Sequence, residues 1–251
     1  MKTKIYSILI ALIVCFNAYA IGDFNLEKAE QSYAAAEYDT ALEVYNSALD
    51  MGYESADLYY NVANCYYRKG ELAASILNYE RALKLEPSHE DAQHNLELAQ
   101  LKTVDKIDVI GSVFFVEWWN AVCNIASANT WAIISIILFV ISLISLSIYI
   151  FVRKLWLRKV GFTVAVVVLL LTIISILCAY TRYEVETSKS EAIVFSQTVT
   201  IKSSPDNSGN DLFILHEGTK VNIKSTLGDW VEINTLDGNS GWMPASAIEV
   251  I

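Results

Sequence analysis

The chain lacks the residue patterns on which most enzymes depend. It has no Gly-rich phosphate loop, no nucleophile elbow and no paired acid–base motif. Its three histidines, His89, His94 and His216, do not form a metal-ligand set, because the spacing of the first two is poor helical geometry for chelation. We therefore expect no enzymatic activity, no cofactor and no metal site.

Cysteine and basic residues are scarce. The four cysteines include no C-x-x-C pair, so we expect buried thiols rather than a disulfide framework or a redox pair. Residues 21–110 hold 17 acidic and 7 basic side chains, and residues 184–251 hold 10 and 4. This lack of a basic patch argues against nucleic acid as a partner. An acidic surface fits either an ectodomain beside an anionic membrane or a basic partner.

Hydrophobic residues make up 54% of the chain and concentrate in three runs. The first follows Lys2 and Lys4 and ends at an A-x-A site, which predicts a secretory signal peptide over residues 1–20; an uncleaved anchor is the alternative. The other two runs carry no charged residue and predict transmembrane helices at 131–152 and 160–180. A buried helical hairpin of a soluble protein is the alternative for these two.

The short loop between the two predicted spans sets the orientation of the chain. Residues 153–159 contain four basic side chains and no acidic one, which predicts a cytoplasmic loop. The segments before and after the hairpin then lie together on the non-cytoplasmic side, whether or not the signal peptide is cleaved. We expect a protein with two spans in the bacterial inner membrane and both end domains in the periplasm.

A 34-residue register relates two stretches of the first half. Ala41, Leu42, Tyr45, Ala48 and Leu49 recur as Ser75, Ile76, Tyr79, Ala82 and Leu83. This period and its mixture of small and large residues predict a tetratricopeptide (TPR) array over residues 21–102. We expect helices at 24–37, 38–51, 56–69, 71–85 and 88–102, the last of them a lone cap opened by a capping box from Ser88 to Asp91.

TPR folds line a concave groove with the first helix of each repeat, and polypeptides bind there. In the second repeat this rule places Tyr60, Asn64, Tyr67 and Arg68 on one stripe, and in the first repeat it selects Tyr33. These side chains suit an extended peptide or a docked helix. The alternative is that the tyrosines merely pack between repeats.

Residues 103–130 connect the array to the first span. Phe114, Phe115, Trp118 and Trp119 cluster there, and such aromatics favour the boundary between membrane and water. We expect an interfacial linker with a helix in the membrane surface; a contact with a partner protein is the alternative.

Residues 187–251 contain short runs rich in β-branched and aromatic residues, a pattern that predicts a small all-β barrel. We expect strands at 192–195, 198–202, 220–225, 230–234 and 241–243. The detailed pattern resembles the bacterial SH3 (SH3b) family in Val199-x-Ile201-x-Ser203-Ser204-Pro205, in His216-Glu217-Gly218 and in Gly238-x-x-Gly241-Trp242. The resemblance implies a groove for peptidoglycan or peptides, for which the candidates are His216, Trp230 and Trp242. For Trp242, a place in the core is the alternative.

The whole arrangement defines a multidomain membrane protein of TPR repeats, a two-helix transmembrane hairpin and an SH3b domain. In this order, and in stretches such as Ser55–Asn61, Leu77–Leu85 and Leu215–Val221, the chain resembles BatE-type proteins of the bacterial Bat aerotolerance operon. The resemblance implies an interaction scaffold in an envelope complex, with von Willebrand-type membrane proteins as partners. A module that targets or senses peptidoglycan through the SH3b domain is the alternative.

Overall fold

A computed structural model describes residues 26–106 and 114–251, so the predicted signal peptide at 1–20 lies outside the described residues. The chain divides into two compact units, and the second begins at Tyr53. Within the described part of the first unit, α2 (Leu26–Ala34) packs on α3 (Tyr38–Asp50) through a buried set consisting mainly of Ala29, Ala41, Leu42, Tyr45 and Ala48. The small residues of the first repeat therefore bring its two helices together as the sequence predicts.

The second repeat opens the second unit with α4 (Ala56–Lys69), α5 (Leu72–Leu85) and α6 (Glu90–Gln100). The Ser55 hydroxyl caps α4 by accepting a hydrogen bond from the Leu58 N–H at 3.1 Å, and Gly70 ends the helix in the left-handed conformation. Alanines at 63, 73, 82, 92 and 99 are buried in one core, which lets the three helices approach closely. The capping box predicted at Ser88 is wrong: α6 begins at Glu90, and the His89 ring accepts from the Ala92 N–H.

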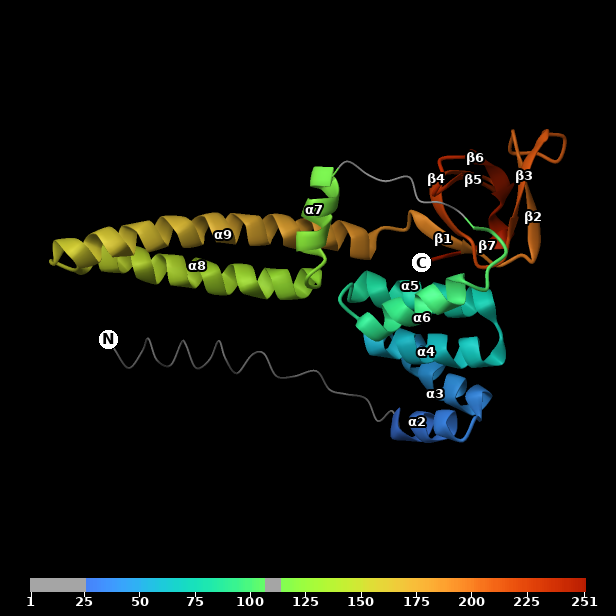
Figure 1. The fold of residues 1–251 in the computed structure, drawn as a ribbon, viewed down its shortest axis with the longest axis horizontal. Coiled ribbons are helices and arrows are strands. Elements are labelled where there is room, and N and C mark those ends of the chain that lie inside the picture. Colours follow the sequence, from blue (N-terminus) through green and yellow to red (C-terminus); the bar gives the residue numbers. More distant parts are fainter. Residues whose placement is uncertain (1–25, 107–113) are drawn as a thin grey trace. The chain divides into compact units, whose positions relative to one another are not determined.

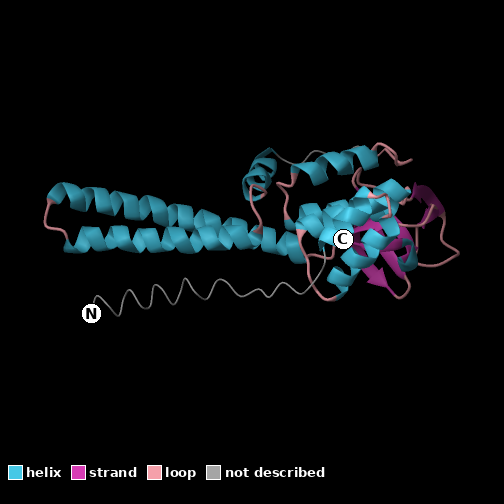
Figure 2. Ribbon diagram, turned by 90° about the horizontal axis from the view of Figure 1, so that it is seen from below, coloured by secondary structure: helices cyan, strands magenta, loops and turns pink. Residues whose placement is uncertain are grey.

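Three further helices follow: α7 (Phe114–Cys123), α8 (Ala128–Phe151) and α9 (Leu155–Thr187). In both views α8 and α9 lie side by side, and the polypeptide reverses direction between them (Figures 1 and 2). Buried Ser142, Ser145, Ala165, Thr172 and Ser175 keep the two axes close, and Gly161 lies against the backbone of Ser145. Both helices are long and apolar enough to cross a membrane.

The boundaries of this hairpin differ from the prediction. Residues 155–159, predicted as loop, already form the first turn of α9, because nothing in Leu155-Trp156-Leu157 interrupts a helix and the Arg158 side chain bonds back to the Tyr149 carbonyl. At its other end α9 continues beyond residue 180 to Thr187. That extension is held by Glu186, which accepts a hydrogen bond from the Ala128 N–H at 2.9 Å.

Seven antiparallel strands form the C-terminal sheet in the order β3-β2-β6-β5-β4-β1-β7. Their bounds are β1 Glu191–Val194, β2 Thr198–Lys202, β3 Asp211–His216, β4 Lys220–Leu227, β5 Trp230–Thr235, β6 Ser240–Pro244 and β7 Ile248–Val250. One face buries an apolar core around Val199, Ile201, Val221, Ile233 and Met243. The prediction did not include β3 and β7. In β3 the run from Leu212 to Leu215 is apolar throughout, although Leu212 and Ile214 are exposed, so its sequence does not show the alternation of a half-buried strand. Strand β7 has only three residues.

Strand β1 is buried on both of its faces. Ala192 and Val194 belong to the core of the sheet, whereas Ile193 belongs to the core of α4–α6 together with Ile251. The strand lies beside α5 (Figure 1). The second TPR repeat and the C-terminal sheet therefore share one continuous packed body.

Candidate protein-interaction surfaces

The predicted stripe on α4 faces α6, which takes the place of the first helix of a following repeat. The Asn64 side-chain oxygen accepts from the Tyr79 hydroxyl at 2.6 Å and from the Asn95 amide at 2.9 Å. The Tyr60 ring lies 4.8 Å from the His89 ring, centroid to centroid. The structure therefore brings Tyr60 and Asn64 together in a half-buried polar layer between α4 and α6.

The end of the stripe is more open. The Lys102 ammonium lies 3.9 Å from the centroid of the Tyr67 ring, a cation–π contact that leaves Tyr67 half-buried. Arg68 is exposed. Tyr33 belongs to the first unit, where its ring meets Tyr38 edge-on at 5.5 Å. Within the second unit, a peptide would therefore reach Arg68 and the edges of Tyr60 and Tyr67, while Asn64 mainly orders the repeat.

His216 lies at the junction between the sheet and the segment after α6, and not in an open groove. Its ring nitrogen Nδ1 is 2.8 Å from Asp105 Oδ1, and its backbone N–H donates to Asp105 Oδ2 at 2.7 Å. The Thr219 hydroxyl donates to the same carboxylate at 2.7 Å. Burial by itself would raise the pKa of Asp105, but these hydrogen bonds outweigh it and lower that pKa. No motif in the sequence marks Asp105, which lies in the predicted interfacial linker but clamps that linker to the sheet.

Charged side chains on α5 form ion pairs with residues of the sheet. Lys220 lies between Glu80 at 2.9 Å and Glu191 at 3.2 Å. Burial opposes the charge on Lys220, but the two carboxylates outweigh it and raise its pKa. Arg81 pairs with Glu249 at 3.1 Å and also donates to the Val250 carbonyl. No motif in the sequence marks these residues, because their partners are distant along the chain.

Trp230 and Trp242 lie on the outer face of the sheet. The register pairs Trp242 with Glu232 and Trp230 with Pro244, while the neighbouring Val231 and Met243 point into the core. Both tryptophans are half-buried. The alternative that Trp242 is a core residue is therefore wrong, and the two rings stand on a surface that a ligand can reach.

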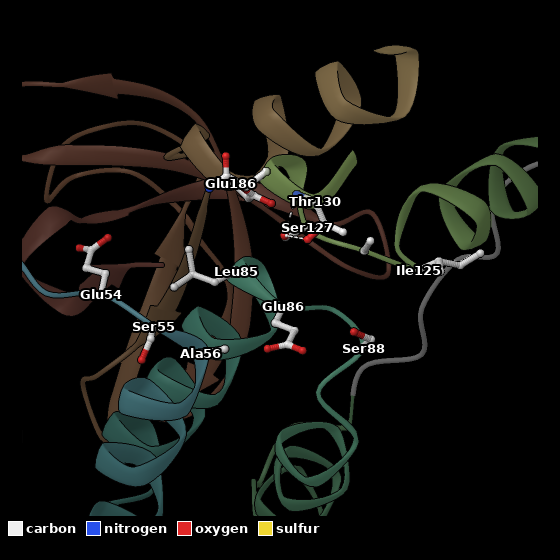
Figure 3. A pocket seen from close by; sticks show the side chains of 12 residues that line it. Glu54, Ser55, Ala56, Leu85, Glu86, Ser88, Ile125, Ser127, Thr130 and Glu186 are labelled. Carbon is white, nitrogen blue, oxygen red and sulfur yellow. Dashed lines mark hydrogen bonds between the residues drawn. The ribbon is translucent and has the colours of Figure 1, made fainter. Parts of the chain in front are cut away.

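A cavity of about 560 Å³ lies among α4, α5, α8 and α9. Its lining includes Glu54, Glu86 and Glu186 but no lysine or arginine, and hydroxyls of Ser55, Ser88, Ser127 and Thr130 accompany them (Figure 3). In the part of the chain that the structure describes, no group of His, Cys, Asp or Glu side chains is placed to hold a metal ion. The acidic cavity therefore offers polar contacts without a metal-binding geometry.

Comparison with known families identifies two segments of the chain. Residues 56–89 match the tetratricopeptide repeat, and residues 197–249 match the bacterial SH3 domain. No curated protein matches the chain significantly. The first match covers α4, α5 and the turn before α6, and the second covers most of the C-terminal sheet. The chain thus contains a TPR repeat, two long apolar helices and a bacterial SH3 domain.

Proposed function

We propose that this protein, which joins a TPR repeat and a bacterial SH3 domain to two long apolar helices, is a protein–protein interaction scaffold of the bacterial inner membrane. Its two spans would hold both domains on the periplasmic side, with the basic turn at residues 152–154 and the first turn of α9 in the cytoplasm. We assign it to the BatE type, with von Willebrand-type membrane proteins as its partners in an envelope complex related to aerotolerance or stress. It would carry no catalytic activity of its own.

The exposure of α8 and α9 supports a place in the bilayer. Only 11% and 22% of their most apolar windows are buried, so they differ from the core helices of a soluble protein. At 1.5 Å per residue the 24 residues of α8 extend about 36 Å, enough for a hydrocarbon core of about 30 Å. Helix α7 crosses the hairpin near the end opposite the turn (Figure 1), and its exposed Phe114, Phe115 and Trp118 suit the membrane surface.

The shared core of the TPR repeat and the SH3 domain is the observation that carries the proposal. Ile193 of β1 and Ile251, which follows β7, are buried with Ile76 of α5, and the Asp105 and Lys220 clusters reinforce the same junction. Two binding surfaces are thereby held in a fixed relation on one body. A scaffold needs this property because it brings two partners together in one defined geometry.

Affinity purification after crosslinking in intact cells tests the role of the TPR stripe. We expect Arg68→Glu in the tagged full-length protein to reduce recovery of von Willebrand-type proteins at least several-fold. Lys69→Glu is the matched control, because it makes the same charge change at the neighbouring position on the same helix. Equal recovery with both variants would contradict a partner on the α4 stripe.

Binding of peptidoglycan through the SH3 domain is the second candidate, favoured by the outward position of Trp230 and Trp242. Sugar rings can stack on the accessible faces of tryptophans that are half-buried in this way. The test is co-sedimentation of the detergent-solubilised full chain with purified sacculi. Trp242→Ala should release the protein if this function holds, whereas Leu101→Ala, an exposed apolar residue outside the sheet, should not. Sedimentation unaffected by Trp242→Ala would count against this candidate.

A further inference from the structure

Two cysteines that are distant in the sequence meet where α7 reaches α9. Cys123 is the last residue of α7, and Cys178 lies near the end of the apolar run of α9. Both side chains are fully buried where α7 contacts α9, and each lies beside one end of the hydrogen bond between Asn124 and Arg182. Cys65, the remaining cysteine of the described chain, is buried separately in α4. The structure therefore contains one thiol pair and one isolated thiol.

Several contacts fix the approach of α7 to α9. The indole N–H of Trp131 donates to the Cys123 carbonyl at 2.8 Å. On the next residue, the Asn124 side chain accepts from the guanidinium of Arg182 at 3.1 Å, and Arg182 lies one turn beyond Cys178 on α9. Arg182 also donates to the Lys84 carbonyl at the end of α5. The pair is thus held by bonds on both sides, at the point where the hairpin joins the TPR repeat.

We propose that Cys123 and Cys178 form a disulfide that fastens α7 to α9. The inference rests on the proposed function in one respect, namely that this end of the hairpin faces the periplasm, where disulfides persist. Two thiols lose two protons and two electrons as the S–S bond forms. The electrons pass to the disulfide of a thiol–disulfide oxidoreductase, which is reduced to a dithiol through a mixed-disulfide intermediate.

The burial of the pair determines when this exchange takes place. Burial, followed by the contact with Cys178, raises the pKa of the Cys123 thiol to about 12, so Cys123 holds almost no thiolate while α7 is packed on α9. The oxidoreductase therefore acts while α7 is undocked, as the newly exported chain folds. Once formed, the bond is shielded from reductants by the same burial. The disulfide keeps the aromatic surface of α7 in a fixed position relative to α9. It thereby also fixes α7 relative to the packed body of the second TPR repeat and the C-terminal sheet.

Thiol counting in the full-length protein tests the proposal. Cells are quenched in acid, free thiols are blocked with N-ethylmaleimide under denaturing conditions, and the protein is reduced and labelled with a polyethylene-glycol maleimide. We expect two labels on the wild-type protein and on Cys65→Ser, and none on Cys123→Ser or Cys178→Ser. Mass spectrometry of the unreduced digest should then recover the peptides of Cys123 and Cys178 as one crosslinked species.

Protease accessibility of the SH3 domain in spheroplasts tests the periplasmic orientation independently of the disulfide. An accessible domain with the crosslinked pair supports the disulfide. An accessible domain with every thiol reduced overturns the disulfide and leaves the proposed orientation intact. A protected domain with reduced thiols overturns the orientation, and the disulfide with it. Linkage of Cys65 to either partner would also overturn the proposed pairing.

Discussion

At the scale of single residues, Asn64 is the polar centre of the second repeat. Its side-chain oxygen accepts two hydrogen bonds, and one donor is the hydroxyl of the fully buried Tyr79. Asn64→Ala leaves those donors unpaired, which costs about 1–3 kcal/mol. We expect hydrogen exchange in α4–α6 to accelerate roughly 5- to 150-fold, measured by mass spectrometry of the full chain in detergent. Gln93→Ala on the exposed side of α6 is the control, and equal protection in both variants would contradict the structural role of Asn64.

Asp105 makes the junction between α6 and the sheet sensitive to acid. Because its pKa is lowered in the folded protein, the carboxylate contributes its full stability above the ordinary carboxyl range near 4. That contribution is lost as the pH falls through this range toward the lowered pKa. We expect proteolysis between Lys102 and Lys106 to rise below about pH 4, assayed with a protease active in acid.

The Asp105→Asn variant isolates this effect, since it removes the titrating group. We expect the junction of this variant to be cleaved faster at pH 7 and to show a smaller further increase in acid than the wild-type chain. Asp211→Asn is the matched control, because Asp211 is an exposed carboxylate on β3, paired only with Lys202 in the described contacts. An identical acid response in wild type and Asp105→Asn would exclude Asp105 as the source.

At the scale of elements, the approach of α8 to α9 depends on Gly161. A Cβ atom there would lie 3.0 Å from the Ser145 carbonyl oxygen and 3.2 Å from the Tyr149 nitrogen, and backbone atoms cannot turn aside as a side chain can. We expect Gly161→Ile to separate the helices near their turn and to speed tryptic cleavage at Arg153 and Lys154 several-fold. Val160→Ile, at an exposed neighbouring position, should cleave at the wild-type rate. Unchanged cleavage of Gly161→Ile would mean that the hairpin tolerates a wider spacing.

At the scale of the whole second unit, Gly218 tests whether the repeat and the SH3 domain are one body. Gly218 has a φ of +84°, and an added Cβ would lie 2.9 Å from Thr103 Cγ2 and 3.0 Å from Ile76 Cδ1. Gly228 also has a positive φ, but a Cβ there meets nothing within 4 Å. Gly228→Ala therefore introduces only the strain of a left-handed backbone, about 1–2 kcal/mol. Gly218→Ala also presses on Ile76 of α5 and on Thr103 in the segment after α6.

We expect the two glycine variants to differ in the junction more than in the sheet. Hydrogen exchange should rise in α5 and β1 of Gly218→Ala but stay near the wild-type level in those segments of Gly228→Ala. Equal exchange in α5 for both variants would indicate that the sheet does not bear on the repeat.

Elements with local signals could be predicted from the sequence alone. The 34-residue register gives α4 its observed bounds and buries Ala92 and Leu96 of α6, and uncharged apolar runs mark α8 and α9. Contacts between distant residues became visible only in the tertiary structure: the burial of β1 on both faces, the clamp of Asp105 on His216, and the burial of Cys123 and Cys178 where α7 contacts α9. The periodicity of a sequence indicates which face of an element is apolar, because apolar residues recur on that face every few positions. It does not record which other element covers the face, so the joining of repeat, hairpin and sheet became visible only in three dimensions.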